Sequence, residues 1–165
     1  MFRTYFEYRR RRKLFEQYLS GATAEAARLS DAPAQQSFTV ERVEYVLIFV
    51  EGEKPEHISA MVGQVTEMAM SHDGLVYSIL GALVLVSFGG APGPAPAAGS
   101  RAAFVTHLSG ELQRRVKMVH GAADAHHGFI GTSLRMSYSL LLPRFDAMLG
   151  ALSRLEFGRV EEFVI

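Results

Sequence analysis

The fold is decided by residues 72–90, which have the sequence HDGLVYSILGALVLVSFGG. Two apolar runs, 75–80 and 83–88, are rich in leucine, isoleucine and valine and are separated only by Gly81 and Ala82. Such residues favour strands, and a connection of two residues is typical of a hairpin. The stretch therefore predicts two short antiparallel strands joined by a tight turn.

A third strand and a helix are predicted upstream of this hairpin. Residues 43–50 (VEYVLIFV) contain a single charge, Glu44, which indicates a central strand buried on both faces. Pro55 suits the first turn of a helix that is expected to reach about His72. One face of that helix is apolar and consists of Ile58, Met61, Val62, Val65, Met68 and Ala69.

A low-complexity segment, GGAPGPAPAAGS, follows the hairpin at residues 89–100. Its glycine and proline content predicts a flexible loop that acts as a passive linker. A lid and a partner-binding polyproline II segment are the alternatives. Ser100 is expected to cap the next helix, whose apolar face consists of Phe104, Val105, Leu108 and Leu112.

The remaining chain predicts further strands and one more helix. From residue 43 onward the order becomes β-α-β-β-α-β, followed by a strand–helix–strand extension. This order is typical of an α+β, ferredoxin-like βαββαβ sandwich, in which helices cover one face of an antiparallel sheet. The further strands are predicted at 116–125, 127–130, 136–142 and 160–165, and the helix at 145–155.

The composition excludes several classes of protein. The chain has 165 residues, the length of one domain, and 48% of them are hydrophobic, which argues against a disordered or coiled-coil protein. It contains no cysteine, which excludes disulfides, zinc–thiolate sites, iron–sulfur clusters and a cysteine nucleophile. The longest apolar run, 79–88, is too short to cross a bilayer.

Positive charge is concentrated at the start of the chain. Residues 1–20 carry six basic and two acidic side chains, whereas the rest of the chain carries 11 basic and 15 acidic ones. Helices are predicted over 2–19 and 22–29. We therefore expect two parts: a basic and aromatic helical segment at 1–37 and a folded domain at 38–165.

The basic cluster Arg9–Lys13 has three interpretations. It can be the polar side of a dimerising helix, a membrane-proximal helix that contacts anionic lipid, or a nucleic-acid contact. The helix contact is favoured, with membrane proximity second. We expect no nucleic-acid binding, because the rest of the chain carries more acidic than basic side chains instead of a basic stripe.

Four stretches of the chain together resemble the class III nucleotidyl cyclase homology domain. Residues 9–27 are similar to the basic, aromatic helix that precedes many bacterial cyclase domains. Residues 45–52 are similar to the strand that ends in a metal-binding Asp in this family, and residues 72–90 are similar to the hairpin with its Gly-Asp turn. Residues 116–156 follow the Gly-rich strand, the Gly-x-Ile-Gly motif and the final helix of the family.

The resemblance implies two-metal chemistry at a site between two subunits. In this family, two Asp carboxylates bind divalent ions, an Asn and an Arg from the partner subunit act on the ribose and phosphates, and a Lys helps to read the base. The first metal Asp corresponds to Glu51, and the second, which follows Gly81, corresponds to Ala82. The Lys corresponds to Ser78, so Ser78 and Gly81 are the nucleotide-binding candidates and Glu51 is the metal candidate.

The final helix allows two alignments, which give the catalytic candidates Asp146 and Arg154. One alignment places Asp146 at the position of the family's Asn and Gly150 at the position of its Arg. The other places Arg154 at the position of the family's Arg and Gly150 at the position of its Asn. The Asn is lost in both. The resemblance therefore predicts a degenerate, catalytically inactive cyclase-like domain that serves in signalling and dimerisation.

Two alternatives remain open at this point. One is an active adenylate or guanylate cyclase, including a heterodimer with a complete cyclase chain, and the other is an unrelated ferredoxin-like binding module. We expect a homodimer and no cofactor, with Mg²⁺ or Mn²⁺ needed if activity remains. A cytoplasmic location is expected, with membrane association possible only through the N-terminal segment.

Two further motifs have a structural and a functional interpretation. Asp124, His126 and His127 could form a small metal site, but a solvated turn before Gly128 is favoured. Residues 128–131 (Gly-Phe-Ile-Gly) could approach a phosphate, but a tight connection between strands is favoured.

Overall fold

The computed structural model describes residues 38–90, 95–132 and 135–164. The helices predicted at 2–19 and 22–29, and with them the Arg9–Lys13 cluster, lie outside the described residues. The elements in chain order are β1 (Phe38–Val50), α3 (Pro55–Ser71), β2 (Leu75–Leu80), β3 (Leu83–Phe88), α4 (Ser100–Leu112), a 3₁₀ turn (Gln113–Arg115), β4 (Val116–Thr132), β5 (Arg135–Leu141), α5 (Phe145–Arg154) and β6 (Val160–Glu162).

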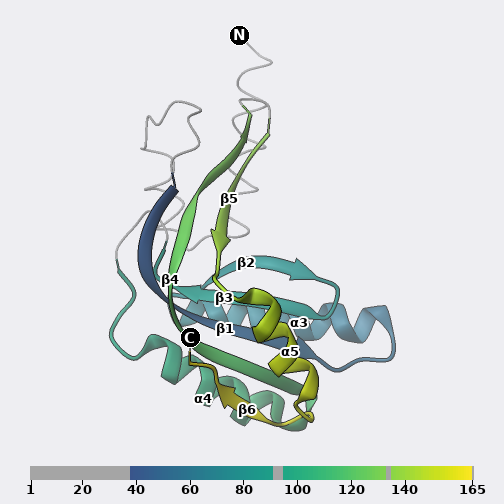
Figure 1. Cartoon of the computed structure of the whole chain (residues 1–165). Helices are drawn as coiled ribbons and strands as arrows, with labels where there is room; N and C mark the ends of the chain where they lie inside the picture. Colours follow the sequence, from purple (N-terminus) through teal and green to yellow (C-terminus); the bar gives the residue numbers. More distant parts are fainter. Residues whose placement is uncertain (1–37, 91–94, 133–134, 165) are drawn as a thin grey trace.

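The strands form one sheet in the order β2-β3-β1-β4-β5 (Figure 1). All neighbours on this path are antiparallel, and β6 adds to β4 in parallel at Met118–His120. The first four strands have the ferredoxin-like arrangement, with β1 central between β3 and β4. The predicted α+β fold with a C-terminal strand–helix–strand extension is confirmed.

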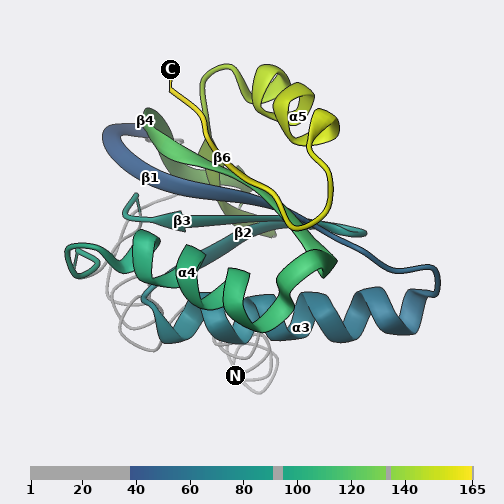
Figure 2. The same cartoon turned by 90° about the horizontal axis from the view of Figure 1, so that it is seen from below.

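Helices cover both faces of the sheet, which corrects the prediction of one covered face. Helices α3 and α4 lie side by side on one face, and α5 lies on the opposite face (Figure 2). The physical reason is the alternation of side chains along a strand, which presents successive residues to opposite faces. Because residues 43–50 of β1 are apolar except for Glu44, both faces of this part of the strand need a cover.

Strand β1 divides the core into two clusters. Val46, Ile48 and Val50 pack with α3 and α4, whereas Tyr45 and Leu47 pack with α5. All five side chains are buried, so the predicted burial of this strand on both faces is confirmed. Each such side chain contributes about 1.5–3 kcal/mol to folding, which makes β1 the centre of the core.

Strand β4 is longer than its sequence pattern predicts. It continues without interruption from Val116 to Thr132, because β1 starts at Phe38 and pairs with it as far as Gly128. The predicted strands 116–125 and 127–130 are therefore parts of one strand, and the predicted solvated turn before Gly128 is wrong. Residues 128–131 also lie inside β4, so they do not form the expected strand connection.

The predicted turn at Gly81 and the predicted helix start at Pro55 are confirmed, whereas the predicted cap at Ser100 is wrong. Gly81 has a φ of +60°, which suits the predicted two-residue turn between β2 and β3. Pro55 is at the start of α3 as predicted. Ser100 is the first residue of α4 rather than its cap: Gly99 occupies the cap position with a φ of +86°. In the described part of the chain, no helix is both long and apolar enough to cross a membrane.

Candidate functional site

The candidate metal residue Glu51 directly follows the buried end of β1. Its backbone N–H donates to the carbonyl oxygen of Arg115 at 2.8 Å, and the N–H of Val50 donates to the carbonyl oxygen of Ala82 at 2.9 Å. These bonds hold the end of β1 between the β2–β3 hairpin and the 3₁₀ turn. The Glu51 side chain is exposed, so its carboxylate is accessible to solvent.

Ala82 is the neighbour of this strand end and has no ligand atom in its side chain. It is half-buried and packs against the core cluster under α3 and α4. A methyl group cannot bind a cation, and Mg²⁺ requires near-octahedral oxygen coordination. Among residues 38–90, 95–132 and 135–164, no three His, Asp or Glu side chains are grouped so that they could hold a metal ion. The residues present therefore do not fit a two-metal site.

The two nucleotide-binding candidates lie on the same hairpin. Ser78 is in β2, where its backbone pairs with Leu85 after a shift in register that begins at Val76. Gly81 is exposed, and an added Cβ would have no neighbour within 4 Å. The surroundings of Gly81 are therefore open, and the left-handed backbone conformation alone favours glycine at this turn.

The catalytic candidates Asp146 and Arg154 lie at opposite ends of α5. Both side chains are exposed. Their positions differ by eight residues, which corresponds to about 12 Å along the helix axis. The Arg154 guanidinium passes over Gly150, and its Nη1 lies 3.7 Å from the place that a Gly150 Cβ would occupy.

Hydrogen bonds connect the Arg154 end of α5 to the sheet beside the end of β1. Lys117 Nζ donates to the carbonyl oxygens of Leu155 at 3.0 Å and of Ser153 at 3.4 Å. Lys117 is also the cross-strand partner of Phe49, two residues before Glu51. The structure thus brings the Arg154 end of the helix, rather than the Asp146 end, toward Glu51.

Sequence reasoning missed this role of Lys117. Its ammonium group lies 5.6 Å from the ring centre of Phe49 and 5.5 Å from that of Phe157, in addition to its bonds with the end of α5. A cation at a helix C-terminus interacts favourably with the helix dipole, and aromatic faces attract it further. No local pattern marks this residue, because its partners come from two distant segments, β1 and residues 153–157.

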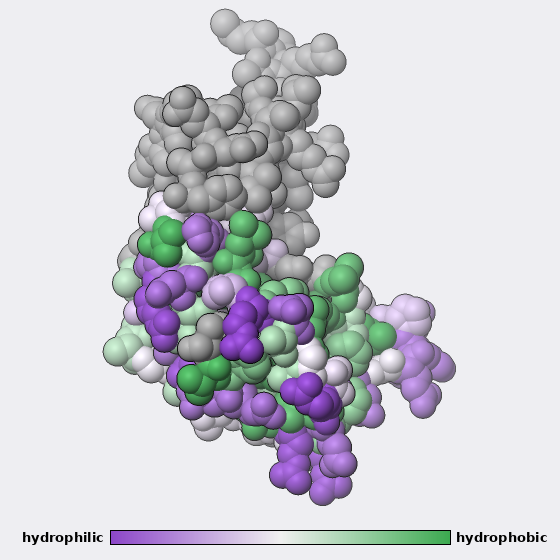
Figure 3. All heavy atoms as spheres, viewed as in Figure 1, coloured by the Kyte–Doolittle hydropathy of each residue, from purple (hydrophilic) through white to green (hydrophobic). Residues whose placement is uncertain are grey.

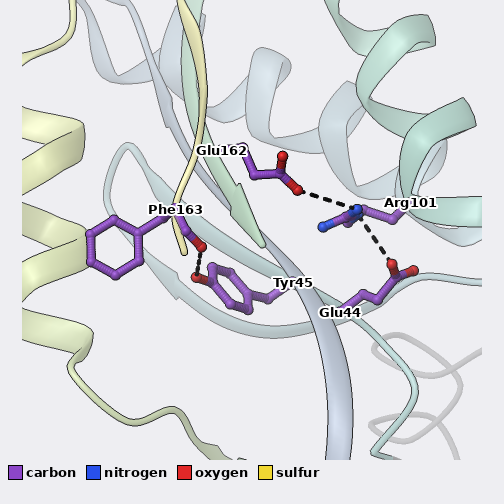
Figure 4. Close-up of polar contacts among 5 residues, drawn as sticks. All are labelled: Glu44, Tyr45, Arg101, Glu162 and Phe163. Atoms are coloured by element: carbon purple, nitrogen blue, oxygen red, sulfur yellow. Dashed lines mark hydrogen bonds and ion pairs between the residues drawn. The ribbon is translucent and has the colours of Figure 1, made fainter. Parts of the chain in front are cut away.

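A second polar group joins β1, α4 and the C-terminal strand (Figure 4). Arg101 Nε lies 3.4 Å from Glu44 Oε1, and Arg101 Nη2 lies 3.9 Å from Glu162 Oε1. The Tyr45 hydroxyl donates to the carbonyl oxygen of Phe163 at 3.4 Å. These contacts fasten β6 to the sheet beside β4.

The pKa values of two side chains at or beside this group, Tyr45 and His120, are shifted from their ordinary values. Burial raises the pKa of Tyr45 above its ordinary value, and the nearby Arg101 and Arg42 oppose that shift. Burial, assisted by the Arg101 charge, lowers the pKa of His120, against the weaker influence of Glu162 and Glu44. In both cases the low polarity of the surroundings disfavours the charged form.

Two of the three candidate metal residues of β4, Asp124 and His127, pair with charged side chains of β1. Asp124 Oδ1 lies 3.7 Å from Arg42 Nη1, and the buried His127 has its Nε2 3.1 Å from Glu41 Oε2. Asp124 and His126 are exposed, whereas His127 is buried, as the alternation of a strand requires. Their arrangement is that of cross-strand pairs rather than a shared ligand set.

Comparison with known proteins identifies the fold. No protein-family model matches the chain, and no curated protein matches it in sequence. Among solved structures, the guanylyl cyclase Cya2 is 15% identical, with a TM-score of 0.55 over 74% of this chain and 75% of that one. A bacterial light-regulated adenylyl cyclase is 12% identical, with a TM-score of 0.64 over 96% of this chain and 53% of that one.

A third neighbour comes from an aquatic fungus. The dimeric guanylyl cyclase domain of the RhoGC fusion protein from Blastocladiella emersonii is 10% identical, with a TM-score of 0.56 over 77% of this chain and 80% of that one. This chain has the fold of a class III cyclase catalytic domain. The strand–helix–strand extension formed by β5, α5 and β6 is part of the cyclase-like fold of this chain. Its presence removes the support for an unrelated ferredoxin-like module, which would lack that extension.

Proposed function

We propose that this chain is a catalytically inactive member of the cyclase-fold group that serves as a signalling and dimerisation domain. The observation that carries the proposal is Ala82, which stands beside Glu51 without a carboxylate. In the described part of the chain, no three His, Asp or Glu side chains are grouped so that they could hold a metal ion at that position or elsewhere. Nucleotide binding at Ser78 and Gly81 and metal binding at Glu51 are not needed for this role.

The size of the expected loss supports an inactive domain. Removing one preorganised group that stabilises charge in a transition state lowers kcat by about 10²–10³-fold. This chain departs from the cyclase pattern at the positions of Ala82 and Ser78 and at the Asn position of α5. Several such losses at one site leave turnover near background, and so no Mg²⁺ or Mn²⁺ cofactor is expected to act here.

Dimerisation is supported by exposed apolar side chains at the edges of the sheet. Leu80 at the hairpin is 74% exposed, and Leu141 at the end of β5 is 52% exposed. On the face that carries α5, polar and apolar side chains are interspersed (Figure 3). A mixed surface of this kind suits an interface between domains more than a deeply apolar ligand pocket.

The test is an assay of the purified full chain with Mn²⁺ and either ATP or GTP. We expect no cyclic nucleotide above the amount formed by the Glu51→Ala variant. Turnover that disappears in that variant contradicts the inactive assignment. Sedimentation at several concentrations tests the second part, and a monomer at all of them contradicts the dimer.

A heterodimer with a complete cyclase chain is the second candidate function. Arg154 favours it, because this Arg is exposed and, in the alignment that keeps the Arg of the family, it would act at a site completed by the partner chain. Mixing with a cyclase chain from the same cell discriminates the two functions. Activity that appears on mixing and is lost in Arg154→Ala supports the heterodimer.

The location of the domain belongs to the same proposal. We infer a cytoplasmic domain whose residues 1–37 contact a second helix, with membrane contact as the alternative. Co-sedimentation with anionic vesicles at low and high salt tests the alternative, since attraction between basic side chains and anionic lipid is screened by salt. Absence of binding at low salt removes the membrane contact.

A further inference from the structure

Two histidines connect the helices that share one face of the sheet. His72 caps the C-terminus of α3, and His107 lies in the middle of α4. His72 Nε2 and His107 Nδ1 are 3.0 Å apart, although 35 residues separate them in the sequence. The contact is exposed, so solutes can reach both nitrogens.

The orientation of the pair is determined by its surroundings. The ring centres are 5.3 Å apart with an interplanar angle of 73°. The His72 ring also packs against the ring of Phe104 in an edge-to-face arrangement, with centres 6.2 Å apart, and Phe104 is fully buried in the core. The backbone N–H of His72 donates to the carbonyl oxygen of Ala69 at 3.1 Å. His72 therefore has both its backbone and one side of its ring held by the fold.

The two imidazole nitrogens are hydrogen-bonded in the metal-free chain, and their separation is also compatible with two ligands of one metal ion. Zinc–imidazole bonds are about 2.0–2.1 Å long, so two adjacent ligands at a right angle are about 2.9 Å apart and two at a tetrahedral angle about 3.3 Å. The observed 3.0 Å lies within this range. Imidazole is a good ligand for Cu²⁺, Ni²⁺ and Zn²⁺, with Cu²⁺ bound most strongly.

We propose that His72 and His107 form a bidentate site for a divalent transition-metal ion that links the end of α3 to α4. Without metal, one proton is shared between the facing nitrogens. When the metal ion binds, the ring that carries this proton on its facing nitrogen changes tautomer, so that the proton resides on its other nitrogen. The lone pairs of both facing nitrogens then bind the ion. Since the described residues provide no third protein ligand, water completes the coordination.

Negative charge near the pair supports cation binding. Asp73 directly follows His72, and Glu111 lies one helical turn after His107. Both are exposed, and negative charge in the neighbourhood of a cation attracts it, an attraction that weakens with distance. The site is separate from Glu51 and Ala82, so the proposal is independent of the function proposed above.

Calorimetric titration of the untagged full chain with Cu²⁺ and with Zn²⁺ tests the proposal. We expect one equivalent to bind, with about 100-fold weaker affinity in each of His72→Gln and His107→Gln, because either change leaves a single imidazole. His57→Gln is the matched control, since His57 is an exposed histidine of the same helix α3. Saturating Zn²⁺ should raise Tm of the unchanged chain by about 5 °C.

Nuclear magnetic resonance of the unchanged chain gives a readout that does not depend on variants. With ¹⁵N-labelled histidine, one equivalent of Zn²⁺ should shift one Nε2 signal and one Nδ1 signal, because the two rings present different nitrogens. Affinity that is unchanged in His72→Gln and His107→Gln overturns the proposal. So does a titration in which no such pair of nitrogens shifts, even if a variant fails to fold.

Discussion

The backbone N–H of Val50 donates a hydrogen bond to the carbonyl oxygen of Ala82, with a nitrogen–oxygen distance of 2.9 Å. This single bond brings the backbones at Glu51 and Ala82 close together, although their numbers in the sequence differ by 31. Under the function proposed above, these two positions have the backbone arrangement of a two-carboxylate site, and position 82 has no carboxylate. The proposed loss of activity therefore concerns the side chain at position 82 rather than the arrangement of the strands.

Restoring that side chain should restore cation binding. We expect Ala82→Asp to bind Mn²⁺, measured as a metal-dependent rise in Tm, because two adjacent carboxylates attract a divalent cation. Ala82→Asn is the control of the same size without charge and should show no rise. If Ala82→Asp responds to Mn²⁺ no more than Ala82→Asn, or responds equally with Glu51→Ala added, the two side chains do not share an ion.

Gly121 lies where β1, β4 and the C-terminal segment meet, and it should not tolerate a side chain. An added Cβ would be 2.7 Å from the Tyr45 hydroxyl oxygen and would also collide with the carbonyl oxygen of Phe163. We expect Gly121→Ala to lower the free energy of unfolding by about 1–3 kcal/mol, the cost of overpacking a filled core.

The matched control for that change is Gly110→Ala. Gly110 is exposed on α4, and an added Cβ there would have no neighbour within 4 Å. Alanine favours helix more than glycine does, so this variant should gain about 0.5–1 kcal/mol. Denaturant unfolding measures both, and equal effects in the two variants contradict the packing described around Gly121.

The lowered pKa of His120 predicts a dependence of stability on pH. Because the folded pKa lies below the ordinary value of 6.5, the unfolded chain takes up a proton at higher pH than the folded chain. Stability should therefore decrease as pH falls below about 6.5, until the folded His120 also becomes protonated. His120→Gln should weaken this dependence, measured by unfolding at a series of pH values, and an unchanged slope contradicts the assignment.

Arg101 gives a second test of the same environment. Its charge helps to lower the pKa of His120, so Arg101→Gln should raise that pKa, which histidine titration by nuclear magnetic resonance can follow. The exposed Arg114 serves as the control, because Arg114→Gln removes a charge from outside this group. A fall in the pKa of His120 in Arg101→Gln, or an equal rise in both variants, contradicts a local effect.

Lys117 should stabilise α5 through its bonds to the last carbonyl groups of that helix. We expect Lys117→Met, which keeps the apolar stem, to cost about 1 kcal/mol from the lost helix-terminal and cation–π interactions. Lys54→Met is the control, since Lys54 is an exposed cation that precedes α3. Denaturant unfolding compares the two, and an equal cost indicates only a general charge effect.

Several elements could be predicted from local sequence. The β2–β3 hairpin has the predicted bounds, and α3 begins at Pro55 and ends one residue before the predicted end at His72. These elements depend on short-range signals: two apolar runs around Gly81-Ala82, and an apolar face at helical spacing after a proline. The positions of Glu51 and Ala82 at strand ends follow from the same signals.

Other features were decided only by tertiary structure. The length of β4 depends on pairing with β1 as far as Phe38, and the placement of α5 depends on the second apolar face of β1. A periodicity within one segment does not specify its distant partner, so these pairings have no local signal.

The same division applies to the candidate sites. The amino-acid sequence specifies which chemical groups are available, and it places an alanine, which has no carboxylate, at position 82. Only the folded chain decided which groups meet: Lys117 with the end of α5, and His72 with His107. The physical reason is that side-chain identity is a local property, whereas a contact between distant residues exists only after packing has brought their elements together.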